Sequence, residues 1–203
     1  MTPRPKDSER ASAKAQTRHL LLQAAAEEFA NEGYAGANIN RISRAAGFAK
    51  GTIYNYFASK RALMLALIDE TAKAHVDFIV DRLRDVEEPG CRLEQFFHSG
   101  FAFIPLHLPQ SRVMVNNIYG PDAEFKAHMF QAYQPLFQLV GRDIIADGVA
   151  RGAFRPIDTE STAILLMTIY LGTGSQVDDT GKPWLDPALV ADFALNALAR
   201  RDS

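Results

Sequence analysis

Two adjacent stretches decide the fold: Asn38-Ile39-Asn40-Arg41-Ile42-Ser43-Arg44-Ala45-Ala46 and Gly47-Phe48-Ala49-Lys50-Gly51-Thr52-Ile53-Tyr54-Asn55-Tyr56-Phe57. In the first, Ile39, Ile42 and Ala46 recur at helical spacing, and the side-chain oxygen of Asn38 suits a helix N-cap. Gly47 supplies the backbone freedom for a tight turn, after which residues 50–56 can form a second short helix. Two short helices around such a turn predict a helix-turn-helix, whose second helix enters the DNA major groove.

The expected open face of the second helix carries side chains suited to DNA. If Ile53 and Phe57 pack inward, the remaining face is formed by Lys50, Thr52, Tyr54, Asn55 and Tyr56. A cation, a hydroxyl, an amide and two phenols match phosphate oxygens and base edges, and no acidic side chain interrupts them. From these residues alone, a solvated helical hairpin with packed tyrosines stays open as the alternative.

A family resemblance rests on a wider set of residues, of which Gly51 to Lys60 is the most diagnostic run. The set is Arg18, Leu21, Ala25, Phe29, Gly33, Ile39, Ile42, Ala46, Gly47, Gly51, Thr52, Ile53, Tyr54, Tyr56, Phe57, Ser59, Lys60 and Leu63. Through it, about the first third of the chain resembles the N-terminal domain of TetR-like transcriptional regulators. The resemblance implies DNA contacts from Asn40, Arg41, Lys50, Gly51, Thr52, Tyr54, Asn55, Tyr56 and Lys60, and we expect Lys60 to hold a phosphate.

Four residues depart from the family pattern. Ala49 stands where a serine usually caps the recognition helix, and losing that cap costs about 1 kcal/mol of helix stability. Arg41 and Arg61 stand where acidic residues are common, and both add positive charge beside the expected DNA surface. Glu28 stands where an apolar residue is usual.

The distribution of charge separates a basic head from an acidic body. Residues 1–61 hold ten Lys/Arg and five Asp/Glu, a balance of +5, whereas residues 62–203 hold twelve and nineteen, a balance of −7; the two sum to the overall −2. Binding to a polyanion is therefore expected to be local to the head. No apolar run approaches the roughly 18 residues of a membrane span, and residues 1–10 lack the apolar core of a secretory signal, so we expect a cytoplasmic protein.

Helical spacing throughout predicts an all-α protein without a sheet. We expect a flexible arm over residues 1–16, a helix-turn-helix domain over 17–60 and a helical effector-binding and dimerisation domain over 61–203. The first helix is predicted from about Thr17 to Glu32, and a long helix capped by Ser59 is predicted to end near Arg84. A further helix from Asp122 to Arg151 should kink at Pro135. Cations of the arm, Arg4, Lys6, Arg10 and Lys14, could reach DNA, but a solvated tail is the better interpretation.

The last two helices predict self-association. Residues 163–171 contain only Thr168 as a polar residue, so their helix should be buried on both sides, with a second chain covering one of them. The closing helix carries Leu189, Phe193, Leu195 and Leu198, and Leu195 is expected at the interface. In TetR-like proteins these two helices pair with their counterparts in a dimeric four-helix bundle, which the resemblance implies here.

Aromatic residues and methionines are frequent in the body. Such a stripe is more often plain core than a pocket, but the resemblance implies an effector site between the middle helices, for an apolar or aromatic small molecule. The predicted lining is Phe97, His98, Phe101, Met114, Asn117, Ile118, Phe130, Tyr133, Phe137, Met167 and Tyr170, with His98, Asn117 or Tyr133 as polar anchor.

Catalytic and cofactor sites are not predicted. The histidines His19, His75, His98, His107 and His128 lack close metal-ligand spacing, and Cys91 is the single cysteine. Residues 172–175 (Gly-Thr-Gly-Ser) follow no strand and lack the third glycine of a dinucleotide fingerprint. The sequence therefore predicts a homodimeric, ligand-responsive repressor of a near-palindromic operator, with no cofactor. The alternative is a helical small-molecule-binding protein or enzyme that merely retains the head domain.

Overall fold

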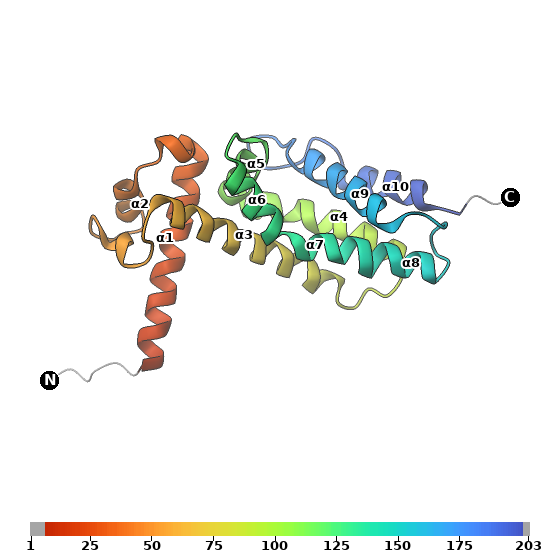
Figure 1. Ribbon diagram of the computed structural model, residues 1–203, viewed down its shortest axis with the longest axis horizontal. Coiled ribbons are helices and arrows are strands. Elements are labelled where there is room, and N and C mark those ends of the chain that lie inside the picture. Colours follow the sequence, from red (N-terminus) through yellow and green to blue (C-terminus); the bar gives the residue numbers. More distant parts are fainter. Residues whose placement is uncertain (1–6, 201–203) are drawn as a thin grey trace. The chain divides into compact units, whose positions relative to one another are not determined.

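The computed structural model describes residues 7–200, and these residues form helices joined by turns and loops, with one isolated bridge between Val177 and Pro183 (Figure 1). The helices are α1 (Asp7–Gly36), α2 (Ile39–Ala45), η1 (Thr52–Asn55), α3 (Lys60–Leu83), α4 (Pro89–Leu106), α5 (Leu108–Tyr119), α6 (Ala123–Ala132), α7 (Gln134–Gln138), η2 (Leu139–Ala146), α8 (Asp147–Ala150), α9 (Thr159–Gly174) and α10 (Pro187–Leu198). The all-α prediction is confirmed. None of the described helices has the length and apolar character needed to cross a membrane.

Helix α1 begins ten residues earlier than predicted, at Asp7 instead of Thr17. Residues 9–16 are exposed, and alanines and other good helix formers extend the helix through them without tertiary packing. Arg10 and Lys14 therefore lie on a helix and not in a flexible arm, whereas Arg4 and Lys6 fall outside the described residues. The predicted end of this helix near Glu32 is confirmed, since the next residue, Gly33, has φ 67° and separates two helical segments.

The helix-turn-helix forms around the predicted cap and turn residues. The Asn38 side chain accepts a hydrogen bond from the Asn40 backbone N–H (2.9 Å), and Gly47 turns the chain with φ 82°. Ile42, Ile53 and Phe57 are buried as expected. The head is thus closed by the apolar stripe that the sequence predicts.

The second helix of the motif is shorter than predicted. Instead of an α-helix over residues 50–56, the chain makes a single 3₁₀ turn, η1, and its first turn has no side-chain cap. Gly51 adopts a left-handed φ of 91°, which prevents a helix from starting before Thr52, and Ala49 has no oxygen with which to cap one. One turn is all that fits before α3, which Ser59 caps by accepting from the Ala62 N–H (3.1 Å).

The chain forms two compact units, and the division falls inside α3. Unit 1 comprises the residues up to Glu70 with Pro109–His128, and unit 2 comprises Thr71–Leu108 with the residues from Met129 onward. The predicted boundary at residue 60 separates a DNA-binding domain from an effector-binding domain. The compact units do not test it, because it is defined by function, and it stays a prediction.

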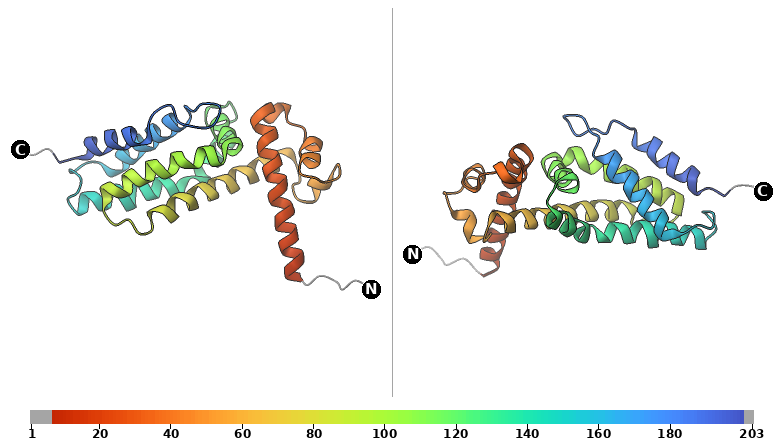
Figure 2. Two further views of the ribbon diagram at one scale, coloured as in Figure 1. Left: turned by 180° about the vertical axis from the view of Figure 1, so that it is seen from behind. Right: turned by 45° about the horizontal axis from the view of Figure 1, so that its top comes forward.

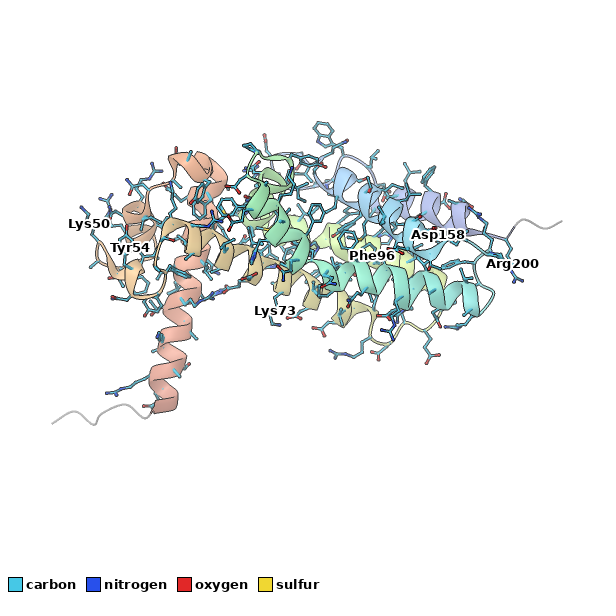
Figure 3. All side chains as sticks on the ribbon, in the orientation of Figure 1. Lys50, Tyr54, Lys73, Phe96, Asp158 and Arg200 are labelled. Atoms are coloured by element: carbon cyan, nitrogen blue, oxygen red, sulfur yellow. The ribbon has the colours of Figure 1, made fainter. Side chains whose placement is uncertain are left out.

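Unit 2 is built around an aromatic core. Helix α10 packs along α4, and α9 packs against η2 (Figures 1 and 2). The predicted break near Pro135 is observed: α6 ends at Ala132, and Pro135 occupies the first turn of α7, where its missing N–H is not required. The chain continues as a π-helical segment, η2, before α8. Fully buried rings at the centre include Phe96, which is labelled in Figure 3, and Phe97.

Candidate nucleic-acid interface and candidate ligand core

A basic surface surrounds the turn of the helix-turn-helix. Residues 33–68 contain five Lys/Arg and no Asp/Glu. Of the predicted contacts, Arg41, Lys50, Tyr54 and Asn55 are exposed, and Lys50 and Tyr54 lie on the outer surface of the turn (Figure 3). Asn40, Gly51, Thr52, Tyr56 and Lys60 are half-buried. This surface offers donors to phosphate oxygens and an amide to base edges.

A shallow depression of about 560 Å³ brings three of the predicted contacts together. Asn40, Tyr54 and Lys60 line it, together with residues 36–39 and with Ala58 and Ser59. The depression joins the start of α2 to η1 and the start of α3. Side chains separated by about twenty residues in sequence thus share one face of unit 1.

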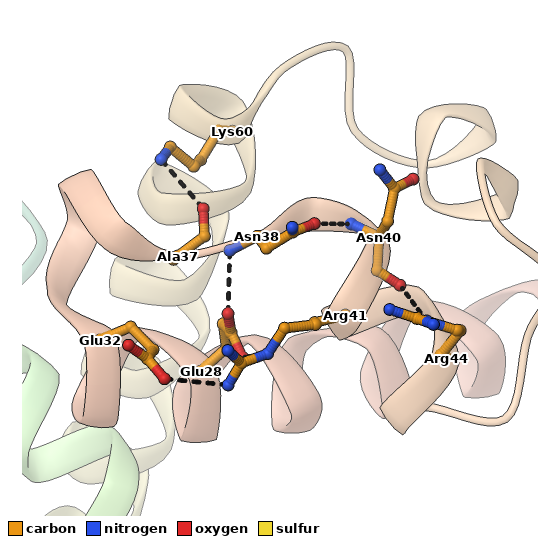
Figure 4. Close-up of polar contacts among 8 residues, drawn as sticks. All are labelled: Glu28, Glu32, Ala37, Asn38, Asn40, Arg41, Arg44 and Lys60. Carbon is orange, nitrogen blue, oxygen red and sulfur yellow. Dashed lines mark hydrogen bonds and ion pairs between the residues drawn. The ribbon is translucent and has the colours of Figure 1, made fainter.

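Two of the predicted DNA-contacting cations have partners inside unit 1 (Figure 4). The Lys60 ammonium donates to the carbonyls of Ala35 (3.0 Å) and Ala37 (3.1 Å) and lies 5.0 Å from the centre of the Tyr34 ring. The Arg41 guanidinium pairs through Nε with Glu28 (3.1 Å) and through a terminal nitrogen with Glu32 (2.9 Å). Their predicted contacts with DNA would have to compete with these bonds.

Three of the four departures from the family pattern are explained by contacts with one another or with a neighbour. Glu28 is only 8% exposed, and its second oxygen, Oε1, accepts from the Asn38 backbone N–H (2.9 Å), so its charge is balanced by Arg41. Arg61 pairs with Glu124 and lies 5.4 Å from the centre of the Phe125 ring. Sequence reasoning missed the role of Glu28, although an unexpected acid and an unexpected arginine in one motif could have indicated a pair.

The fourth departure, Ala49, takes part through its backbone. Its carbonyl accepts from the Ser43 hydroxyl (2.9 Å) and from the Thr52 N–H (3.0 Å). Ser43 is fully buried in α2, so its hydroxyl fastens the turn to the first helix of the motif. This bond positions η1 without the usual capping side chain.

The predicted ligand residues are divided between the two units. Met114, Asn117 and Ile118 belong to unit 1, where Asn117 donates to the Val113 carbonyl (2.8 Å) and lines a pocket of about 490 Å³ with Phe29, Tyr34 and Phe125. The other eight belong to unit 2. In that unit the core contains Phe97, Phe101, Met167 and Tyr170, with Tyr133 and Phe137 packed against it. Phe130 is 44% exposed, and its ring lies 6.4 Å from that of Phe137.

A buried polar cluster lies within the aromatic residues of unit 2, and sequence reasoning missed its central residue, His75. His75 Nε2 lies 2.8 Å from the Tyr170 hydroxyl, and Nδ1 lies 3.3 Å from the Tyr133 hydroxyl. Its ring stacks on Phe103 at 4.2 Å. A neutral imidazole has one donor and one acceptor, so it can serve both hydroxyls. The spacing of Ile68, Ala72, His75 and Ile79 along one face of α3 was the signal that could have identified it.

Burial keeps the cluster uncharged. It lowers the pKa of His75 to about 4, against a smaller opposing effect of a backbone contact with Gly100, and it raises the pKa of Tyr133 and Tyr170. Gly100 is required there, because a Cβ would lie 2.3 Å from the Tyr170 hydroxyl. One turn before His75 on α3, the buried hydroxyl of Thr71 has no hydrogen-bond partner among the described residues.

A second depression in unit 2, of about 590 Å³, lies between α4 and the loop before α10. Predicted residues His98 and Phe101 line it, beside Pro105, Trp184 and Lys182. Within residues 7–200, no group of three His, Cys, Asp or Glu side chains is arranged to hold a metal ion.

Comparison with known proteins also points to the helix-turn-helix as the DNA-binding region. Residues 21–67, which contain the helix-turn-helix, match the family model described as "Bacterial regulatory proteins, tetR family". An uncharacterised HTH-type transcriptional regulator, YhgD of Bacillus subtilis, is 26% identical over 159 residues, covering 75% of this chain and 79% of its own. The repressor KstR2 of Rhodococcus jostii is 26% identical over 202 residues, covering 93% and 96%. The match over residues 21–67 and these relatives support the resemblance of the chain to TetR-like transcriptional regulators.

Solved structures share the fold over nearly the whole chain. The fatty acid degradation regulator FadR of Bacillus halodurans superposes with a TM-score of 0.80 at 20% identity, covering 91% of this chain and 97% of its own. FadR of Bacillus subtilis, in complex with stearoyl-CoA, has a TM-score of 0.75 at 17% identity, covering 89% and 97%. At such identities the likeness shows a common fold and leaves the ligand of this chain to be inferred separately.

Proposed function

We propose that this chain is a homodimeric transcriptional repressor that binds a near-palindromic operator and releases it when a small apolar effector binds. The observation that carries the proposal is the basic helix-turn-helix surface, with Lys50, Tyr54 and Asn55 exposed and no acidic residue between positions 33 and 68. The relative KstR2 is named a repressor, which supports a role in repression. Operator binding makes the cytoplasm its place of action, and no catalytic role is proposed.

The exposed apolar side chains of the last helices support a dimer. Ile164 (54% exposed) and Leu165 (63%) leave one face of α9 open, and Leu189 (58%) and Phe193 (64%) do the same on α10. Exposed apolar faces of this kind are typical of an interface, and a second copy of α9 and α10 would cover them. A two-fold dimer then presents two reading elements about 34 Å apart, which is one turn of DNA.

Leu195 is not the residue with which to test this interface. It is half-buried and packs against the core of its own unit, so a charge there would damage the fold. Phe193, on the open face of the same helix, takes its place.

The effector is proposed to be an acyl thioester or a similar molecule with a long apolar part. The stearoyl-CoA bound to Bacillus subtilis FadR supports this class, and the aromatic core of unit 2 offers apolar surroundings. Within that core, His75, Tyr133 and Tyr170 offer polar atoms, and the unpartnered Thr71 hydroxyl could donate to a carbonyl oxygen of the effector. Burying an acceptor there would satisfy a hydroxyl that otherwise lacks a bond.

Fluorescence anisotropy with a labelled duplex tests the DNA-binding part. The duplex is taken from the region upstream of the chain's own gene and is compared with a scrambled duplex of the same composition. We expect saturable, salt-dependent binding that is tighter on the native duplex, because phosphate contacts supply affinity and base contacts supply selectivity. Equal affinity for both, at every salt concentration and with duplexes tiled across that region, would favour the alternative of a ligand-binding protein that merely retains the head.

The effector part is tested by adding stearoyl-CoA, shorter acyl-CoA thioesters and free CoA to the protein–operator complex. The thioesters should raise the midpoint of thermal unfolding and lower operator affinity by a factor corresponding to about 1–3 kcal/mol of coupling. Free CoA is the control, since it has the polar part without the acyl chain. Release by free CoA alone, or no release by any thioester, would contradict the proposed class.

A further inference from the structure

The short segment that leads into α2, residues 35–38, is held from two sides. On one side the buried Glu28 carboxylate, on α1, accepts from the Asn38 backbone N–H. On the other side the Lys60 ammonium, at the start of α3, donates to the carbonyls of Ala35 and Ala37; Figure 4 shows the bonds to Glu28 and Ala37. Three helices of unit 1 therefore meet at one stretch of backbone. We name three groups the α2 clamp: the Glu28 carboxylate, the Asn38 amide that it accepts from, and the Arg41 guanidinium that pairs with it.

Both oxygens of Glu28 are used in this clamp. Oε1 accepts from Asn38 N at 2.9 Å, and Oε2 pairs with Arg41 Nε at 3.1 Å. A carboxylate that is only 8% exposed is tolerated because it is paired and hydrogen-bonded. Arg41 also pairs with Glu32 at 2.9 Å, so α1 holds the first turn of α2 through two carboxylates.

The clamp acts on the residue that caps α2. Asn38 accepts from the Asn40 N–H with its side chain while its own N–H is fixed by Glu28. Its geometry therefore sets where α2 begins and how Asn40, on the rim of the DNA-facing depression, is presented. Because base contacts depend on the position of the reading elements, a shift here should cost selective binding more than general attraction to phosphates.

We propose that Glu28 is a positioning residue for operator recognition and that Arg41 serves it as a clamp partner and not as a phosphate contact. This inference rests on the proposed function of sequence-selective DNA binding. Arg41 was expected to contact DNA, and its side chain is 52% exposed, so the two roles make different predictions. A phosphate contact contributes about one unit to the dependence of log K on log salt, whereas an internal clamp contributes none.

The experiment uses the full-length chain and four substitutions: Glu28→Gln, Glu28→Leu, Arg41→Gln and Lys50→Ala. Affinity for the native and the scrambled duplex is measured across a series of salt concentrations, after circular dichroism has confirmed a helical fold. Lys50→Ala is the matched control, because Lys50 is an exposed cation on the same surface. It should weaken both duplexes and lower the salt slope by about one unit.

For the clamp variants we expect loss of selectivity. Glu28→Gln and Arg41→Gln should each lower affinity for the native duplex about tenfold, with the scrambled duplex and the salt slope unchanged, since a bond to a charged group is lost inside the protein. Glu28→Leu should lower affinity for the native duplex further, because it also leaves the Asn38 amide without its acceptor. The double variant Glu28→Gln/Arg41→Gln should lose little more than either single one, since both act on one interaction.

Two results would overturn the inference. If Arg41→Gln weakens both duplexes equally and lowers the slope by about one unit, Arg41 is a phosphate contact. If Glu28→Gln leaves native-duplex affinity unchanged, Glu28 does not position the reading surface.

Hydrogen exchange separates failure of the clamp from failure of the proposed function. The Asn38 amide should exchange more quickly in Glu28→Leu than in the wild type, and the Ala62 amide, capped by Ser59, should be unchanged. An unchanged Asn38 amide would contradict the clamp even in a protein that binds its operator. A wild type without duplex selectivity would contradict the proposed function, and the Asn38 amide would still test the clamp.

Discussion

The head of unit 1 and the core of unit 2 are held together by different kinds of contact. The start of α2 is fixed by directional bonds to Glu28, Arg41 and Lys60 at the rim of a surface, whereas unit 2 is fixed by rings such as Phe96 and Phe97 that water does not reach. Directional bonds specify position and contribute modestly to stability, while buried rings contribute much stability and specify position less sharply. Substitutions in the two regions should therefore separate operator recognition from folding.

The largest effect is expected in the aromatic core. Phe97→Ala should lower the free energy of unfolding by about 3–5 kcal/mol, because it removes a fully buried ring and leaves a cavity. Urea unfolding at a fixed protein concentration measures this. Leu106→Ala, which truncates an apolar side chain that is 65% exposed, is the control and should change little. A small decrease in the free energy of unfolding for Phe97→Ala would mean that buried aromatic rings are not the main source of stability in unit 2.

Acid should destabilise unit 2 through His75. Its folded-state pKa of about 4 lies below the ordinary histidine pKa of 6.5, so the unfolded chain binds the proton first, and stability is lost as pH falls from about 6.5 towards 4. The loss approaches about 3 kcal/mol for this one group. Urea unfolding of wild type and His75→Gln at pH 7 and pH 4.5 should show a smaller pH dependence in the variant. His98→Gln is the control, and a wild-type-like pH dependence in His75→Gln would refute the assignment.

The dimer surface should couple assembly to DNA binding. Phe193→Asp should give monomers in sedimentation at micromolar concentration and weaken operator binding about a hundredfold or more, because the second half-site is no longer held in place. Val80→Asp places the same charge on an exposed position of α3 and should leave both properties unchanged. A Phe193→Asp protein that remains dimeric would move the interface away from α10.

The smallest effect is expected from the exposed reading surface. Asn55→Ala should cost about 1–3 kcal/mol of operator binding and very little stability, because an exposed amide that reads a base edge has no role in packing. The scrambled duplex is the comparison. Equal losses on both duplexes would remove Asn55 from base reading and assign it to a phosphate.

The sequence determined the local features of this protein. Helical spacing predicted the all-α class, and the side chains of Asn38 and Ser59 predicted the two helix caps. Gly47 predicted the turn, and Ile53 and Phe57 predicted the inward face of the motif. These features depend on residues within a few positions of each other, where spacing and side-chain type are sufficient. The length of the second helix was an error of the same local kind, because the left-handed Gly51 was not anticipated.

Tertiary structure alone decided which side chains meet. Glu28 finds Arg41 across two helices, Lys60 turns toward the carbonyls of Ala35 and Ala37, and His75 bridges Tyr133 and Tyr170 over more than fifty residues. Such contacts depend on the angle and register at which helices dock, and many dockings bury the same apolar stripe. A polar residue is satisfied in only a few of them, so its partner becomes known when the packing is known.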